Sequence, residues 1–243
     1  MNAFRGVVGL LPRFVPNPPL MSLIVKICGL STEETLDAAL AAGADMVGLN
    51  FFPRSPRFVT PEHAAELAKR AAGRAEVVAL TVDMDDAGIA GIVAAVAPDW
   101  LQLHGQETPE RVAEVRERFG RAVMKALPIA AAEDVARAAD YMAVADQLLL
   151  DARPPKDATR PGGNGAPFDW TLLSGFDPDI PWMLSGGLAP GNVAEAVALT
   201  GAPGVDVSSG VESAPGRKET NLIRAFIANA RGAGPIVQRV AAS

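Results

Sequence analysis

The feature that most constrains the fold is a repeat in which eight short apolar runs alternate with longer, alanine-rich segments. In order, the runs are LIVKI from Leu23, MVGLNF from Met46, VVALTV from Val77, WLQL from Trp100, AVMKA from Ala122, QLLL from Gln147, PWML from Pro181 and GVDV from Gly204. Each run is continuous rather than alternating, which is typical of strands buried on both faces of a parallel sheet. Eight strand-helix units in one chain predict an α/β fold, a single closed (β/α)8 barrel of the TIM type.

Helix start signals lie between several of the runs. Ser31 with Glu34 predicts a capping box, and Thr60 and Thr108 each place a hydroxyl group directly before a proline. A doubly wound open sheet is the alternative fold. It is disfavoured because residues 28–31, CGLS, lack the second and third glycines of its nucleotide-binding fingerprint.

The length of 243 residues and the 49% apolar composition fit one domain with a continuous core. We expect a barrel over residues 22–231, a loosely packed or disordered N-terminal extension over 1–21 and a C-terminal tail over 232–243. Met1 and Met21 are both candidate starts. A signal peptide is the competing interpretation of the N-terminus, but its apolar stretch is short and Pro12 and Arg13 interrupt it.

The net charge and the cysteine content exclude several classes of binding partner and site. A formal net charge of −6 at pH 7 argues against a nucleic-acid groove and against an anionic membrane surface. No apolar run approaches the roughly 20 residues that span a bilayer. The single cysteine, Cys28, excludes an internal disulfide and fits a reducing compartment, the cytoplasm. One cysteine and two distant histidines cannot form the usual zinc sites, so we expect no metal.

Glycine runs follow the seventh and eighth strands, and each leads towards a helix. The residues of interest are Gly186 and Gly187 after the seventh strand, and Ser209 and Gly210 after the eighth. At this place in barrels, backbone N–H groups and a helix N-terminus hold phosphate groups. Two tight turns are the alternative for either run alone. Both runs at adjacent strand ends predict a phosphate-binding barrel.

Two reactive side chains are expected at the same end of the barrel. Cys28 follows the first strand and Asp151 follows the sixth, so the two can face each other across a ligand. A buried free cysteine is usually packing, and an aspartate at a strand end is often a helix cap or an ion-pair partner. The neighbouring phosphate site favours a functional role for both.

Further polar residues are candidates for ligand contact. Arg57 lies in the proline-stiffened loop 53–57 and could bind a carboxylate in bidentate fashion, with a surface ion pair as the alternative. His104, at the end of the fourth strand, belongs to either the pocket or the rim. Lys125 and Asp206 are polar groups in apolar strands, so each needs a partner, from a neighbouring strand or from the substrate.

The connection after the sixth strand differs from the others. Its sequence, ARPPKDATRPGGNGAP after Asp151, is rich in proline and glycine and is too long for an ordinary βα loop. We expect it to form a mobile lid over a ligand.

Six motifs together resemble the phosphoribosylanthranilate isomerases of tryptophan biosynthesis. They are VKICGL, GADMVGLNFFPRSPRFV, LQLHGQE, LLLDARPP with GGNGAPFDW, LSGGLAPGNV and VDVSSGVESAPGRKE, which occur in family order over residues 23–231. The resemblance implies one (β/α)8 barrel that uses no cofactor and acts on a small phosphosugar as a monomer or homodimer. Another phosphosugar barrel and a non-catalytic phosphosugar-binding barrel are the alternatives.

By position, the resemblance implies Cys28 as general base, Asp151 as general acid and Arg57 as the arginine that engages the anthranilate moiety. The two glycine runs match the phosphate site, and we expect further substrate contacts from His104, Asp206 and Gly163. The implied reaction is an Amadori rearrangement. Protonated Asp151 opens the furanose ring to a Schiff base, and the Cys28 thiolate then removes the C2' proton.

A Cys28 thiolate beside a protonated Asp151 is not the ordinary pair of protonation states, so the site must stabilise it. With ordinary pKa values of about 8.5 and 3.9, a thiolate with a carboxylic acid lies roughly 6 kcal/mol above a thiol with a carboxylate. Two local asymmetries could favour the reactive arrangement. Lys26 or nearby backbone N–H groups could stabilise the thiolate, and desolvation or a substrate anion could raise the pKa of the acid.

Overall fold

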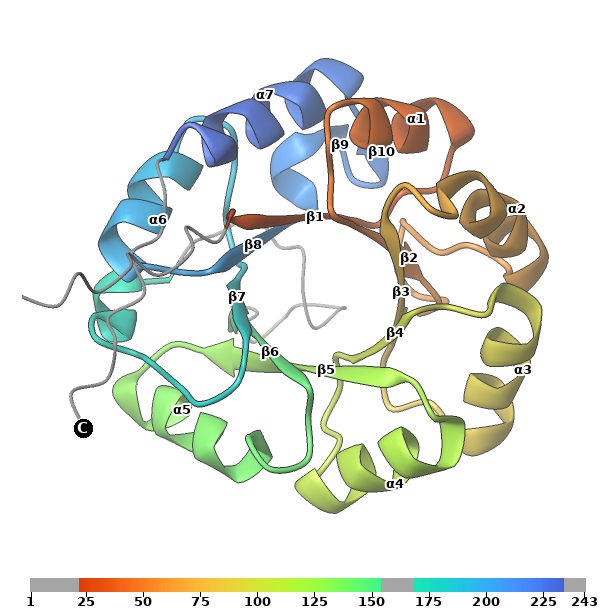
Figure 1. Cartoon of the computed structure of the whole chain (residues 1–243), viewed down its shortest axis with the longest axis horizontal. Helices are drawn as coiled ribbons and strands as arrows, with labels where there is room; N and C mark the ends of the chain where they lie inside the picture. Colours follow the sequence, from red (N-terminus) through yellow and green to blue (C-terminus); the bar gives the residue numbers. More distant parts are fainter. Residues whose placement is uncertain (1–21, 154–167, 234–243) are drawn as a thin grey trace, which may run out of the picture.

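In the structure, a computed structural model, residues 22–153 and 168–233 are described. The predicted N-terminal extension, most of the predicted tail and lid, and Gly163 lie outside these residues. Within them, eight parallel strands close into a barrel in sequence order, since β1 pairs with both β2 and β8 (Figure 1). The predicted fold class is confirmed.

All eight predicted runs form strands, with ends that differ by up to three residues. The strands are β1 (Ile24–Cys28), β2 (Met46–Asn50), β3 (Glu76–Thr81), β4 (Trp100–Leu103), β5 (Ala122–Ile129), β6 (Gln147–Ala152), β7 (Trp182–Leu184) and β8 (Gly204–Val207). Their continuous apolar sequences are explained by burial on both faces, against the barrel interior and against the helices.

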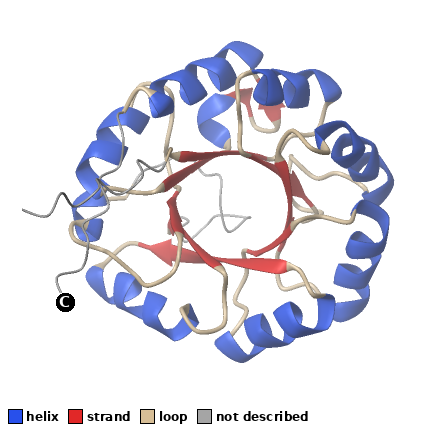
Figure 2. Ribbon diagram, viewed as in Figure 1, coloured by secondary structure: helices blue, strands red, loops and turns tan. Residues whose placement is uncertain are grey.

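The helices form a ring around the strands (Figure 2). They are α1 (Glu33–Ala41), α2 (Pro61–Ala71), α3 (Asp86–Val96), α4 (Pro109–Phe119), α5 (Ala132–Ala136), α6 (Val193–Thr200) and α7 (Thr220–Arg231), with short 3-10 helices η1 (Arg137–Tyr141), η2 (Trp170–Leu173) and η3 (Ser209–Val211). No helix in the described part of the chain is long and apolar enough to cross a membrane.

Two of the three predicted helix starts are correct. Thr60 accepts the N–H of His63 at the start of α2, and Thr108 accepts the N–H of Arg111 at the start of α4. The capping box at Ser31 is wrong, because α1 begins one residue later than expected. Its N-cap is Thr32, whose hydroxyl oxygen accepts the N–H of Thr35. Adjacent hydroxyl residues satisfy the same sequence signal, and only the backbone register separates them.

The barrel interior changes from apolar to polar towards the carboxyl ends of the strands. Six buried residues form an apolar cluster inside it: Met46, Val78, Met124, Ala126, Leu149 and Met183. Lys26, Gln102 and Asp206 are buried polar residues from β1, β4 and β8. Because side chains two residues apart on a strand share a face, Cys28 and His104 follow Lys26 and Gln102 towards the mouth of the barrel.

The opposite end of the barrel carries a repeated capping contact. Asp45, Asp99 and Asp146 each stand just before an even-numbered strand, and their carboxylates accept the N–H groups of Val25, Val77 and Val123. These contacts tie β1, β3 and β5 to the strands that follow them. At this end of a (β/α)8 barrel such residues serve stability.

A two-stranded hairpin follows β8 and was not expected from the sequence. It consists of β9 (Glu212–Ala214) and β10 (Arg217–Lys218), which pair in antiparallel fashion. Gly216 at its turn has a φ of +82°, and a Cβ atom there would lie 2.4 Å from the carbonyl oxygen of Pro56. The hairpin therefore packs tightly on the loop that carries Arg57.

Candidate active site

Cys28 is the last residue of β1 and points towards Gly48 of the neighbouring strand β2. A Cβ atom at Gly48 would lie 2.8 Å from the sulfur, so glycine makes the room that the thiol occupies. The side chain is buried, but it belongs to neither apolar cluster of the described residues. The thiol therefore lies among polar groups at the barrel mouth, although little of it is exposed.

Burial is the largest influence on this thiol, and it raises the pKa of Cys28. The positive charge of Lys26 opposes this effect, and the negative charge of Asp206 adds to it. Lys218 and Arg57 also oppose it, yet the pKa stays above the ordinary value. Lys26 does act in the expected direction, but it does not make the thiolate the resting form. A pKa above the ordinary value favours the thiol over the thiolate as the resting form of Cys28 at neutral pH.

This conclusion can be tested directly because the chain has one cysteine. We expect the thiolate absorbance of the native protein near 240 nm to rise with an inflection above about pH 8.5, the ordinary value for a thiol. The unfolded chain should titrate at the ordinary value. A native inflection below that value would contradict the assignment of a resting thiol.

Asp151, on β6, is buried and held by two contacts. Its Oδ1 atom accepts the N–H of Ala152 at 2.9 Å, and its Oδ2 atom lies 3.2 Å from Nε2 of His104. Asp151 and His104 therefore contact each other at the carboxyl ends of β6 and β4, and His104 is half-buried.

A continuous polar chain links this carboxyl group to β1. Nδ1 of His104 lies 2.8 Å from Nε2 of Gln102, whose Oε1 accepts a hydrogen bond of 2.8 Å from Lys26. Lys26 also donates to Asp206 at 2.9 Å. Asp206 in turn accepts from the Ser185 hydroxyl at 3.3 Å. Asp206 thus finds its partners on neighbouring strands, which is one of the two roles that its sequence position allowed.

Arg57 is buried and forms a bidentate ion pair with Glu212 of the β9–β10 hairpin. Its Nε and Nη2 atoms donate to the two carboxylate oxygens at 2.6 and 2.8 Å. The stem of Arg57 passes so close to Gly29 that a Cβ atom there would lie 2.5 Å from its Cδ atom. Gly29 also has a φ of +75°, so glycine is required after Cys28 for two reasons. The alternative considered for Arg57 was a surface ion pair; the ion pair that it forms is buried.

Lys218 completes this group on the other side of Glu212. Its ammonium group donates to Glu212 at 2.8 Å and to the carbonyl oxygen of Ser208 at 2.9 Å. Burial lowers the pKa of Lys218 to about 8, although the charge of Glu212 opposes the effect. Sequence reasoning missed both residues. The only signal was a cluster of charges in VESAPGRKE, which is equally typical of an exposed loop.

The two glycine runs meet as predicted. Gly186 and Gly187 have φ values of +86° and +68°, which favour glycine. A Cβ atom at Gly210 would lie 1.8 Å from the carbonyl oxygen of Leu188, so the two loops touch backbone against backbone. Asn192 braces the first loop by donating to the carbonyl oxygen of Gly187 at 3.0 Å. The loops after the seventh and eighth strands, where these glycines lie, are the place where barrels bind phosphate through backbone N–H groups.

The position of Lys125 in an apolar strand is explained by its contacts with the protein, and it lies outside this site. Its ammonium group binds Glu107 at 2.7 Å and the carbonyl oxygen of Gly105 at 2.8 Å. Its strand neighbours Met124 and Ala126 face the barrel interior, so Lys125 faces the helices. Contacts with the end of β4 and the loop that follows it therefore account for this lysine.

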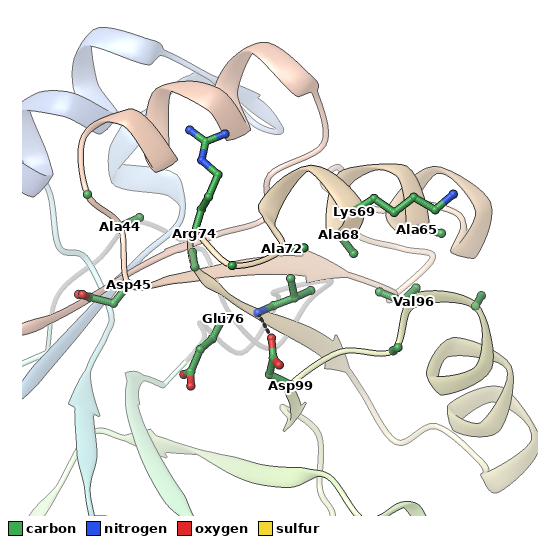
Figure 3. Close-up of a pocket in the computed structure, with 16 residues that line it drawn as sticks. Ala44, Asp45, Ala65, Ala68, Lys69, Ala72, Arg74, Glu76, Val96 and Asp99 are labelled. Atoms are coloured by element: carbon green, nitrogen blue, oxygen red, sulfur yellow. Dashed lines mark hydrogen bonds between the residues drawn. The ribbon is translucent and has the colours of Figure 1, made fainter.

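A groove of about 910 Å³ lies at the other end of the barrel (Figure 3). Alanine side chains line it together with mixed charges, among them Lys69, Arg74 and Glu76. It includes Asp99, whose carboxylate accepts the N–H of Val77 at 2.7 Å. None of the predicted site residues lines it, and we assign it no part in the chemistry.

Comparisons with known proteins agree with this geometry. Residues 25–229 match the family model described as N-(5'-phosphoribosyl)anthranilate (PRA) isomerase. A relative from Rhodopseudomonas palustris, named N-(5'-phosphoribosyl)anthranilate isomerase, is 64% identical over 211 residues, which cover 87% of this chain and 97% of that protein. One of the same name from Nitrobacter winogradskyi is 61% identical, covering 88% and 95%.

Solved structures give the same result. The phosphoribosylanthranilate isomerase of Thermotoga maritima is 35% identical, with a TM-score of 0.78 and coverage of 86% of this chain and 99% of that one. A phosphoribosylanthranilate isomerase in complex with reduced 1-(o-carboxyphenylamino)-1-deoxyribulose 5-phosphate is 34% identical, with a TM-score of 0.76 and the same coverage. A 3-hexulose-6-phosphate synthase, at 20% identity and a TM-score of 0.60, shares the fold alone.

Proposed function

The chain belongs to the N-(5'-phosphoribosyl)anthranilate isomerase family, and we propose that Cys28 and Asp151 carry the two proton transfers of its reaction. The protein is an isomerase of L-tryptophan biosynthesis. It converts N-(5-phosphoribosyl)anthranilate to 1-(2-carboxyphenylamino)-1-deoxyribulose 5-phosphate by an Amadori rearrangement. The observation that supports the residue assignment is that Cys28 and Asp151 both lie at the carboxyl ends of inner strand faces, with a polar chain that runs from Asp151 to Lys26, the cation that acts on Cys28.

Asp151 is the proposed general acid. In its protonated form it donates to the ring oxygen of the furanose, and the C1'–O bond breaks to leave a protonated Schiff base with the anthranilate nitrogen. His104 holds the carboxyl group from one side, and the N–H of Ala152 holds it from the other. These two contacts fix the direction in which the proton leaves.

Cys28 is the proposed general base. Its thiolate removes the C2' proton, the electron pair moves into the iminium group, and the enolamine that forms tautomerises to the ketone. The iminium group accepts the electrons, so the reaction needs no cofactor. Because the free enzyme holds a thiol, the reactive thiolate must arise with substrate bound. Lys26 and Lys218 are the nearby cations that stabilise it.

The remaining contacts of the substrate are proposed as follows. The loops after β7 and β8, with Gly186, Gly187, Ser209 and Gly210, bind the phosphate. Arg57 binds the anthranilate carboxylate while Glu212 holds its guanidinium in place. Close backbone packing of the two loops supports the first assignment, and the buried bidentate pair supports a fixed position for the arginine.

Replacing Arg57 with alanine should mainly raise KM, because the arginine binds the anthranilate group before and during the reaction. It should also destabilise the fold, since Glu212 loses one of its two buried cationic partners and keeps only Lys218. Arg54→Ala is the matched control, because Arg54 is exposed in the same loop. Steady-state kinetics and urea unfolding measure the two effects. An unchanged KM in a folded Arg57→Ala protein would contradict the assignment.

A coupled assay tests the function as a whole. Phosphoribosylanthranilate is generated in situ, the protein is added, and the loss of anthranilate-type fluorescence is followed. Purified protein that binds phosphate esters but leaves the fluorescence unchanged would favour a non-catalytic phosphosugar-binding barrel.

We also propose that the enzyme works in the cytoplasm as a monomer or homodimer. The free thiol at the site supports a reducing compartment, since an oxidised thiol could not act as a base. A dimeric relative from Thermotoga maritima, of which monomers have been generated, supports the second assembly state. Sedimentation of the purified protein distinguishes the two.

A further inference from the structure

Gln102 occupies the middle of the polar chain and is completely buried. Its amide group touches two partners of different character, Lys26 through Oε1 and His104 through Nε2. An amide can be built in either of two orientations, and the correct one follows from its partners. The protonation state of Lys26 therefore decides whether the oxygen or the NH2 group of the Gln102 amide faces His104.

Lys26 is an ammonium ion and can only donate hydrogen bonds. Burial alone lowers the pKa of Lys26, but the negative charge of Asp206, 2.9 Å away, together with Cys28 outweighs it. The pKa of Lys26 is therefore raised, and the ammonium group must face an acceptor. The oxygen of the Gln102 amide consequently points to Lys26, and the NH2 group points to His104.

This orientation of the Gln102 amide determines the tautomer of the His104 ring. Nδ1, 2.8 Å from a donor, must accept, so the single ring proton lies on Nε2. Nε2 lies 3.2 Å from Oδ2 of Asp151. An imidazolium ring would instead place an Nδ1–H group against the amide N–H of Gln102.

We propose that Gln102 is a positioning residue that holds His104 as the neutral Nε2–H tautomer and keeps a full positive charge away from Asp151. This inference rests on the proposed role of Asp151 as the general acid. An imidazolium beside Asp151 would hold it as a carboxylate, which has no proton to donate. A neutral ring keeps an uncharged polar contact of 3.2 Å with the carboxyl group. Lys125, on the outer face of β5 and bound to Glu107, adds no second cation beside the ring.

The chain is well suited to a spectroscopic test because it contains only two histidines, His63 and His104. Long-range ¹⁵N–¹H correlation spectra at pH 7 report the tautomer and charge of each ring. His63→Gln identifies the second set of signals. His63 is exposed and donates to the carbonyl oxygen of Ser31, so this variant should keep normal turnover.

Two variants at position 102 change the group that faces Nδ1. In Gln102→Glu a carboxylate replaces the amide NH2, so we expect a doubly protonated His104 ring and a kcat lowered at least about 100-fold, with KM nearly unchanged. In Gln102→Met both contacts disappear at similar volume, so we expect a mixture of tautomers and a smaller fall in kcat, about 10-fold. Wild-type protein should show only the Nε2–H form.

The spectra separate this inference from the assignment of the acid. A wild-type His104 that is charged or protonated on Nδ1 would overturn the role of Gln102, even in a fully active enzyme. Normal kcat in a folded Gln102→Glu or Gln102→Met variant would also overturn it. If the wild-type ring is the Nε2–H tautomer but Asp151→Asn keeps its activity, the acid assignment fails and with it the purpose proposed for Gln102. If Gln102→Glu does not fold, the wild-type spectrum and the kcat of Gln102→Met still test the role proposed for Gln102.

Discussion

Replacing Asp151 with asparagine should lower kcat by at least about 100-fold, the lower limit for loss of a general acid. The amide has nearly the same shape, so it can still contact His104 and the N–H of Ala152, but it has no proton to give to the furanose oxygen. Ring opening then depends on water. The fluorescence assay with saturating substrate measures the effect.

A matched control for this substitution is Asp179→Asn, at an exposed aspartate that lies outside the site. It should retain wild-type turnover. Both variants should unfold at temperatures close to that of the wild type. If the Asp151→Asn enzyme is folded and turns over at a near-normal rate, another group supplies the proton and the assignment of Asp151 is lost.

Replacing Cys28 with alanine should lower kcat by a similar factor, at least about 100-fold, because no other thiol exists to remove the C2' proton. The substitution removes one buried sulfur atom beside Gly48, so a modest loss of stability is expected as well. Cys28→Ser keeps a similar volume and polarity but offers a much weaker base.

Together the two variants separate chemistry from packing. We expect Cys28→Ser to be nearly as stable as the wild type and as inactive as Cys28→Ala. Substantial activity in the serine variant would mean that the sulfur packs or positions the substrate and does not act as a base. In that case Lys218, whose pKa is lowered to about 8, becomes the next candidate base.

The barrel could be predicted from the sequence because each strand is buried on both faces. That burial produces continuous apolar runs such as WLQL at Trp100, which coincides with β4. Strand ends then locate the chemistry, since all eight carboxyl ends of a parallel barrel meet at one mouth. This is why the sequence predicts that Cys28, Asp151 and His104 lie at the same end of the barrel. The error at Ser31 was local, because Thr32 offers the same hydroxyl one residue later.

Other parts of the site could not be predicted, because they depend on which residues of neighbouring strands face each other and on how burial and charge combine. Gln102 is one polar residue in an apolar run, and its contact with Lys26 requires the inner faces of β1 and β4 to be known. The β9–β10 hairpin is built from very short strands without periodicity, so Glu212 and Lys218 gave no strand signal. Burial raises the pKa of Cys28, and the nearby positive charges lower it. Which of these effects is larger depends on distances that only the structure gives.

The most direct test of the central claim follows the hydrogen at C2'. Substrate deuterated at C2' is generated in situ and mixed with excess wild-type, Cys28→Ala or Asp151→Asn enzyme, and loss of the label from C2' is followed by mass spectrometry. We predict rapid loss with the wild type and almost none with either variant. The cysteine variant lacks the base, and the aspartate variant never forms the Schiff base that makes this hydrogen acidic. Release of the label by Cys28→Ala at the wild-type rate would contradict the account.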